Sequence, residues 1–211
     1  MEITWYGHSC FRLSEKQRAT VVTDPFDESI GYPLPKLKAD VVTVSHDAPG
    51  HNNVNAVKSI TRTISGAGEY EIGGVFIIGV PLHNTDPEHL RSNIAYLFDF
   101  GDLTVAHLGD MSRVPEQSEI EALGSIHIAL VPVGGGSALN STQAAQVIAL
   151  LEPRIVIPMH YQTELSTLPL EPIDRFLKEM GVSHVQHEDM LKITGATLPE
   201  TPQIVMLNSA R

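Results

Sequence analysis

The sequence predicts an α/β fold in which strands outnumber helices. This prediction comes from the length of 211 residues, the hydrophobic content of 42% and the many short apolar runs. The length suits one compact unit, because domains cluster at about 100–200 residues, and we therefore expect residues 1–211 to form a single domain. The composition supports a large core and excludes a disordered or collagen-like chain.

Strands are predicted where apolar runs rich in Val and Ile, about 4–8 residues long, are bounded by Gly, Pro, Asp or Asn. Runs of this length are typical of buried strands, because a buried helix gives a longer run. The chain opens on a mixed strand pattern over residues 1–5. Further strands are predicted at 21–23, 40–44, 75–80, 94–98, 103–107, 126–132 and 154–158.

Helical signals are fewer and fall mainly in the second half of the chain. Asn140 and Gln143 have the spacing of a capping box, and an apolar periodic segment follows up to residue 151. Two further helices open at a proline and stop at a glycine. The predicted helices are 115–123, 141–151, 172–180 and, directly after a His-rich loop, 52–60.

The excess of acidic over basic residues disfavours some classes of binding partner. Fourteen Lys and Arg stand against 25 Asp and Glu, which gives a net charge of −11. Such a surface repels phosphates, so it disfavours a general nucleic-acid binder and a membrane-surface protein. Neither a basic leader nor an apolar run of about 18 residues occurs. Cys10 is the single cysteine, which fits a reducing compartment, and we expect a cytoplasmic protein. The sequence does not predict the oligomeric state.

Ten histidines in a chain with few aromatic residues indicate a function in metal binding or acid–base catalysis. Several polar side chains follow predicted buried strands, where open α/β folds collect ligand-binding residues. Imidazole and carboxylate together form divalent-metal sites, so the sequence predicts a metal site at these strand ends. The residues concerned are His46, His51, His83, Asp110 and His160.

Four segments carry motifs in a recognisable order. They read Trp-Tyr-Gly-His-Ser-Cys-Phe at 5–11, Thr-Asp-Pro-Phe at 23–26, Leu-Gly-Asp at 108–110 and Ile-Pro-Met-His-Tyr at 157–161. Their order resembles the metallo-β-lactamase superfamily over nearly the whole chain, and the first two resemble the branch that includes ascorbate-6-phosphate lactonase. The resemblance implies a four-layer αββα sandwich, with two mixed sheets face to face, helices outside and the site at one edge.

The resemblance also implies roles for the predicted ligands. Metal site one would keep His46 and His83, site two would keep His51 and His160, and Asp110 would bridge them as the central catalytic carboxylate. The implied cofactor is zinc, one or two ions per chain at partial occupancy, with manganese or iron as alternatives. The implied reaction is hydrolysis of a small ester-like, lactone or phosphorylated substrate.

The main metal motif of the family, H-x-H-x-D-H, is incomplete in this chain. Ala48 stands where the second His is expected, and Gly50 stands where the Asp is expected. Each half-site still keeps three ligands when Asp110 is counted twice, which is the ligand count of a catalytic zinc. Asp47 is a substitute only if its side chain turns inward, since neighbouring side chains of an extended loop point in different directions.

Two functions follow from this incomplete motif. The first is an impaired metal-dependent hydrolase, because the missing Asp would orient the attacking water and such positioning is worth several kcal/mol of barrier. The second is a catalytically inactive family member, natural or engineered, that binds a ligand or partner through the same cleft. His8 either faces this cleft with a catalytic role or is structural, and His107 is expected to support the site or fill the core.

From the incomplete motif we predict fewer than two metal ions per chain in protein purified without chelator, measured by elemental analysis. Ala48→His together with Gly50→Asp should raise metal content towards two and raise ester or lactone hydrolysis by orders of magnitude. Neither single substitution should suffice, because two metals and an oriented water act as a unit. Two tightly held metals in the unaltered chain, with no effect of the double substitution, would contradict this alignment.

Overall fold

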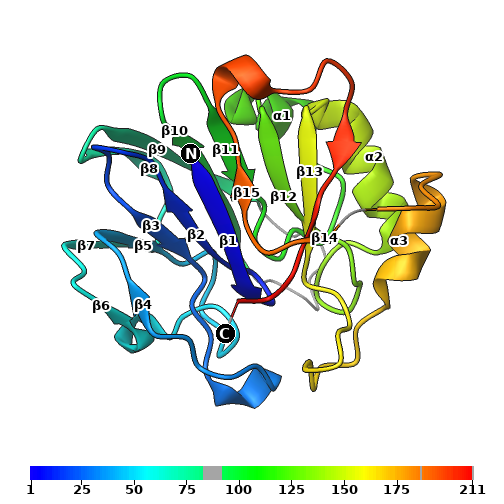
Figure 1. Ribbon diagram of the computed structural model, residues 1–211, viewed down its shortest axis with the longest axis horizontal. Coiled ribbons are helices and arrows are strands. Elements are labelled where there is room, and N and C mark those ends of the chain that lie inside the picture. The colour runs from blue at the N-terminus through cyan, green and yellow to red at the C-terminus, as the bar shows by residue number, and fades with distance from the viewer. Residues whose placement is uncertain (83–91, 186, 211) are drawn as a thin grey trace.

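The computed structural model of this protein describes residues 1–82, 92–185 and 187–210. Within these residues two mixed β-sheets pack face to face (Figure 1). The first sheet has the strand order β15-β1-β2-β3-β5-β7, and the second has the order β16-β13-β12-β11-β10-β9-β8. The predicted α/β class with two packed sheets is therefore confirmed.

The strands of both sheets are short, as the apolar runs indicated. The first sheet consists of β1 (Glu2–Gly7), β2 (Cys10–Ser14), β3 (Val21–Thr23), β5 (Val41–Thr43), β7 (Arg62–Ile64) and β15 (Leu191–Lys192). The second consists of β8 (Gly68–Ile72), β9 (Val75–Leu82), β10 (Asn93–Asp99), β11 (Thr104–His107), β12 (Ile128–Pro132), β13 (Ile155–Met159) and β16 (Gln203–Ile204). A separate pair joins β14 (His187–Glu188) to β17 (Met206–Leu207).

Strands β3 and β5 of the first sheet are buried on both faces. Successive side chains of a strand point to opposite sides, so each of these strands contributes to two apolar clusters. In β3, Val21 belongs to the main core between the two sheets, whereas Val22 belongs to a second apolar cluster on the outer face. This outer cluster includes residues of the 3-10 helix η1 (Glu28–Ile30) and of the strands β4 (Leu37–Lys38) and β6 (Val57–Lys58). Burial on both faces explains why these strands read as continuous apolar runs.

Three of the predicted helices are present as α1 (Gln117–Leu123), α2 (Ser141–Leu151) and α3 (Ile173–Glu179). Helices α2 and α3 lie beyond β13, on the side of the second sheet away from β1 (Figure 1). The predicted capping box of α2 forms. The Asn140 side chain accepts from the Gln143 N–H at 2.9 Å, and the Gln143 side chain accepts from the Asn140 N–H at 3.1 Å.

The predicted helix over 52–60 is wrong. This segment contains the 3-10 helix η2 (Val54–Ala56) and then strand β6, which pairs in parallel with β4. Asn53 donates from its side chain to the Phe26 carbonyl at 3.0 Å, and Asn side chains that bind backbone in this way oppose helix propagation. The buried Val57 packs in the outer apolar cluster, so a tertiary contact decides the conformation.

Parallel pairing places the residues that follow several strands at one edge of the fold. Strands β3 and β5 are parallel in the first sheet, and β11, β12 and β13 are parallel in the second. Asp24 follows β3, His46 follows β5, Asp110 follows β11 and His160 follows β13. This arrangement brings side chains from both sheets to the same edge.

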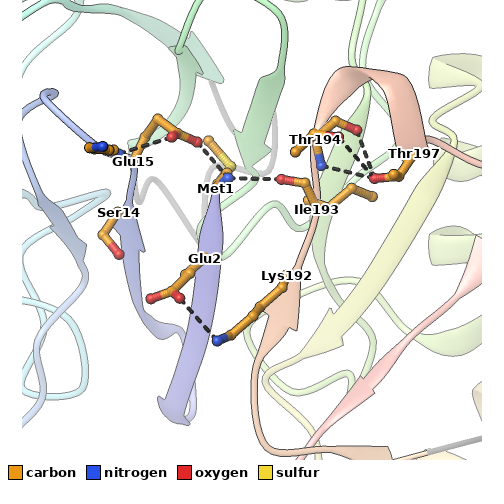
Figure 2. Close-up of a pocket in the computed structure, with 9 residues that line it drawn as sticks. Met1, Glu2, Ser14, Glu15, Lys192, Ile193, Thr194 and Thr197 are labelled. Atoms are coloured by element: carbon orange, nitrogen blue, oxygen red, sulfur yellow. Dashed lines mark hydrogen bonds and ion pairs between the residues drawn. The ribbon is translucent and has the colours of Figure 1, made fainter.

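The amino end of β1 is the end of that strand distant from His8. Here β1 pairs with β15 (Figure 2). The Met1 ammonium donates to the Ile193 carbonyl at 2.8 Å and pairs with Glu15 at 2.5 Å. Lys192 pairs with Glu2 at 3.3 Å across the two strands, and both side chains are largely exposed. These contacts line a wide surface hollow that is separate from the strand edge described above.

We predict that the protein unfolds in one cooperative transition, because the main core draws buried side chains from both sheets. Far-ultraviolet circular dichroism and the fluorescence of Trp5, which lies in this core, should report coincident melting curves. Two separate transitions would show that the two sheets belong to independent units.

Candidate functional site

Five side chains from both sheets converge at the strand edge, and we call them the His-Asp cluster. All five are buried, with exposures of 9% or less, and they are His8, His46, His51, Asp110 and His160. Asp110 lies at the centre. Its Oδ1 is 3.4 Å from His51 Nε2 and 3.3 Å from His160 Nε2, and its Oδ2 is 3.7 Å from His46 Nε2.

The cluster forms one side of a cavity of about 230 Å³. Ser137 also lines this side, and its hydroxyl donates to Asp110 Oδ2 at 2.8 Å. The other lining residues are mainly apolar and include Ile30, Pro49 and Leu168. A lining that combines a few buried polar groups with apolar side chains is the usual composition of a small-ligand site.

The buried Asp24 carboxylate organises two of the histidines. It accepts hydrogen bonds from the Ser45 N–H at 2.8 Å, from the Ser45 hydroxyl at 2.6 Å and from His51 Nδ1 at 2.7 Å. Because the only hydroxyl proton of Ser45 goes to Asp24, the Ser45 oxygen accepts from His46 Nδ1, which lies 3.0 Å away. His46 and His51 therefore both carry their proton on Nδ1 and turn Nε2 towards Asp110.

Electrostatics favour an anionic Asp110 and a neutral His8. Burial raises the pKa of Asp110, but the nearby His160 and His51 outweigh this effect and hold the pKa well below its usual value. Burial, together with the same two histidines, lowers the pKa of His8 well below its usual value. A neutral His8 offers a nitrogen lone pair, which is the protonation that metal binding requires of an imidazole.

The spacing of the cluster fits a bound dication. In tetrahedral zinc sites with bonds of about 2.0–2.1 Å, neighbouring ligand atoms lie about 3.3 Å apart. Asp110 Oδ1 has this separation from two imidazole nitrogens and, among the described residues, has no hydrogen-bond partner. Two groups of three residues could each hold a metal ion, and we call them triads. Within each triad every residue offers one ligand atom, and these atoms lie within 4.8 Å of one another. The triads are His8, His51 and His160, and His46, His51 and Asp110.

The backbone around the site is strained, as is common where function fixes a side chain. Asp24, His8 and His160 have positive φ angles of 39°, 51° and 52°, although none is glycine. Gly109 also has a positive φ, and a Cβ there would lie 2.2 Å from the side-chain oxygen of Asn93. That oxygen accepts from the Asp110 N–H at 2.9 Å, so glycine at 109 allows the contact that positions Asp110.

Of the site residues predicted from the sequence, the structure brings His8, His46, His51, Asp110 and His160 together. His83 lies outside the described residues. His107 is fully buried in the core, where Nε2 donates to the Ser9 carbonyl at 2.8 Å and Nδ1 accepts from the Gly109 N–H at 3.2 Å. Asp47 is exposed and accepts from the Asn52 side chain, so its contacts do not support a substitute ligand.

Three residues of the site were not singled out from the sequence, namely Asp24, Ser45 and Ser137. A signal for Asp24 was available, because it directly follows an apolar strand in the same way as the predicted ligands do. Ser45 precedes His46 in the same loop, but no local pattern shows that its hydroxyl bridges two loops. Ser137 follows the Gly-rich turn after β12, and glycine-rich turns alone do not distinguish a site from a loop.

Gly50 adds a steric condition to the restoration experiment predicted from the sequence. A Cβ at this position would lie 2.9 Å from His8 Nε2, closer than ordinary van der Waals contact. An Asp side chain at 50 therefore needs the His8 ring to turn away. We expect the double substitution with Ala48→His to restore metal binding only if this movement occurs.

From the role of Asp24 we predict that Asp24→Asn weakens zinc binding about 10–100-fold, the usual cost of losing a group that orients metal-binding histidines. Asparagine keeps the size of the side chain and tolerates positive φ, so the folded structure should persist. The matched control is Asp40→Asn, which alters a carboxylate bound to the Thr20 N–H outside the site. Calorimetric zinc titration of both variants checks this, and equal affinities would disprove the orienting role.

Comparison with known proteins agrees with this geometry. The family model described as the beta-lactamase superfamily domain matches residues 2–160. A UPF0173 protein of Pyrococcus furiosus is 29% identical over 204 residues, covering 85% of this chain and 90% of that protein. A UPF0173 metal-dependent hydrolase of Desulforamulus reducens is 29% identical over 196 residues, covering 77% of this chain and 85% of that protein.

A solved structure gives the same result. It is a Thermotoga maritima protein assigned as a Zn-dependent hydrolase of the metallo-β-lactamase superfamily, with 36% identity, a TM-score of 0.81 and coverage of 98% of this chain and 97% of that chain. The likeness to the ascorbate-6-phosphate lactonase branch stays a prediction. The extent of the family match and the likeness to this structure show that the chain belongs to the metallo-β-lactamase superfamily.

Proposed function

We propose that this protein is a metal-dependent hydrolase that acts on a small ester-like, lactone or phosphorylated substrate in the cavity beside the His-Asp cluster. The observation that carries the proposal is Asp110 Oδ1, which is buried between two imidazole nitrogens at ligand spacing and has no hydrogen bond from the residues that the structure describes. The curated relatives named as metal-dependent hydrolases support the same class of activity.

The residues that would hold the metal are His46, His51, Asp110 and His160, with His83 as a further candidate from the sequence. The donor set is rich in imidazole nitrogen, which suits zinc, with iron or manganese as alternatives. A bound zinc would supply a water of lowered pKa and would polarise a carbonyl or phosphoryl oxygen. One or two ions per chain are compatible with the two triads.

The residues around the ligands would keep this site in one arrangement. Asp24 fixes the tautomers of His46 and His51, which keeps both Nε2 atoms directed to the cleft. Ser137 holds the Asp110 carboxylate from the cavity side. Burial of these groups excludes bulk water and strengthens their electrostatic action on a substrate.

The cavity suggests a small substrate. Its volume of about 230 Å³ is below the usual range of drug-sized sites, about 300–1,000 Å³. Ile30, Pro49 and Leu168 offer an apolar wall for the carbon skeleton, while the polar wall would face the bond to be cleaved. Gly50 provides no carboxylate to orient water, so we expect slow turnover.

A second candidate is a catalytically inactive member of the superfamily that binds a ligand or partner in the same cavity. The absence of a ligand side chain at Ala48 and Gly50 favours it. Metal-stimulated turnover distinguishes the two candidates, because a binding protein would take up metal without hydrolysis.

The cellular setting is also part of the proposal. Among the described residues, none of the helices is both long and apolar enough to cross a bilayer. The buried single thiol of Cys10 fits a cytoplasmic setting, and the net charge of −11 disfavours nucleic-acid substrates. We therefore propose a cytoplasmic enzyme with a small-molecule substrate.

The test uses protein stripped with chelator and reloaded with zinc, assayed on panels of lactones, activated esters and phosphate esters. We predict zinc-stimulated hydrolysis in at least one panel and a loss of about 100-fold or more in Asp110→Asn, because the central anionic ligand is removed. Asp99→Asn, an exposed carboxylate at the other end of the same β10 strand that presents Asn93, is the control and should keep full activity. Activity independent of metal, or retained in Asp110→Asn, would refute the proposal.

A further inference from the structure

His8 lies in the site although the ligand pattern of the motif does not include it. One ring nitrogen each of His8, His51 and His160 lies within 4.8 Å of the others, and all three rings are buried. We propose that His8 is itself a metal ligand and takes the place of the carboxylate that residue 50 lacks. This inference rests on the proposed metal binding and names a ligand that neither the motif nor the comparisons assign.

The first support is the space that His8 fills. The point where a Cβ of residue 50 would lie is 2.9 Å from His8 Nε2 and 3.2 Å from the adjacent ring carbon Cδ2. Gly50 itself has no positive φ that would require glycine. The absence of a side chain at 50 therefore serves to admit the His8 ring to the cleft.

The second support is the backbone that holds His8. Its φ of 51° is unusual for a residue other than glycine, and its carbonyl accepts from Trp5 Nε1 at 3.0 Å and from the His160 N–H at 3.2 Å. The bond to residue 160 joins His8 directly to another histidine of the cluster, and their ring centroids are 4.3 Å apart. A strained residue held on both sides and aimed into a cleft is typical of a functional position.

The third support is the pairing of two nitrogen atoms. His8 Nε2 lies 3.1 Å from His51 Nε2, and His51 already carries its proton on Nδ1, which is bonded to Asp24. Two imidazole lone pairs at this distance repel unless a proton or a metal ion is shared by them. Without metal, a proton on His8 Nε2 would donate to His51 Nε2. With the His8 proton on Nδ1, both Nε2 lone pairs would be available to one metal ion, because the nitrogen ligands of one zinc ion lie at about this separation.

The exchange of a carboxylate for an imidazole changes the chemistry of the site. His8, His51 and His160 form an all-nitrogen triad, so Asp110 is the one anionic ligand of the cluster among the described residues. Nitrogen ligands favour zinc over manganese, which prefers oxygen ligands. We therefore expect the preference for zinc to depend on His8.

The experiment titrates zinc alone into full-length protein that has been stripped with chelator. In His8→Asn, which keeps a residue suited to positive φ, we expect zinc affinity to fall by more than about 100-fold, or one equivalent of zinc to be lost, and the ratio of zinc affinity to manganese affinity to fall. Loss of a direct ligand should exceed the 10–100-fold effect of an orienting group. The matched control is His184→Asn, an exposed histidine outside the cluster, which should bind zinc as the unaltered chain does.

A second variant leaves His8 in place and crowds its ring. Gly50→Ala adds the single Cβ described above and should also weaken zinc binding, by displacing the imidazole. Gly66→Ala is its control, because the nearest atom to a Cβ there is 3.9 Å away and the position has no positive φ. Normal zinc affinity in both His8→Asn and Gly50→Ala would overturn the inference.

A direct measurement is the coupling between ¹¹³Cd and the ring nitrogens of ¹⁵N-labelled histidine. A coupling to His8 Nε2, absent from His8→Asn, supports ligation, whereas couplings to other cluster histidines without His8 overturn it. The latter result leaves the proposed metal-dependent function intact. If the unaltered chain binds neither zinc nor cadmium, the proposed function and this inference fail together.

Discussion

The buried carboxylate of Asp24 is the group on which the geometry of the cleft depends. It accepts three hydrogen bonds from two residues that belong to a different loop, and through Ser45 it also determines the protonated nitrogen of His46. Burial alone would raise its pKa, but His107 and His51 outweigh this and keep the pKa below its usual value. One anion therefore fixes the orientation of two imidazoles, which an uncharged acceptor would hold less firmly.

The two-sheet architecture explains why this group can act on distant parts of the chain. Strands β3 and β5 are parallel neighbours, so the loops after them start at the same edge, and Asp24 reaches Ser45 and His51 across that edge. Strands β11 and β13 deliver Asp110 and His160 from the second sheet. Because the site lies where the sheets meet, its polar groups are desolvated by both, and each one needs a partner or a cation.

The incomplete motif has a structural counterpart in His8. The loop of 46–51 carries no side chain at Gly50, and the imidazole of His8, from the turn after β1, lies against that position. A neutral ring in place of an anion leaves Asp110 as the central negative charge facing several histidines. The space beside Gly50 is therefore occupied by a side chain from a neighbouring turn of the same fold.

The amino-acid sequence by itself indicated the α/β class, the longer buried strands, three of the helices and most of the polar cluster, but not strands β2, β7 and β8. Strand runs, the Asn140 cap and the rule that polar residues gather after buried strands are local patterns, so they were readable for His46, Asp110 and His160 without coordinates. Tertiary structure decided the role of Asp24, the orientation of His8 and the absence of a helix over 52–60. These depend on contacts between loops that are distant in sequence, such as His8 with His51, and no local periodicity encodes the distance between such loops.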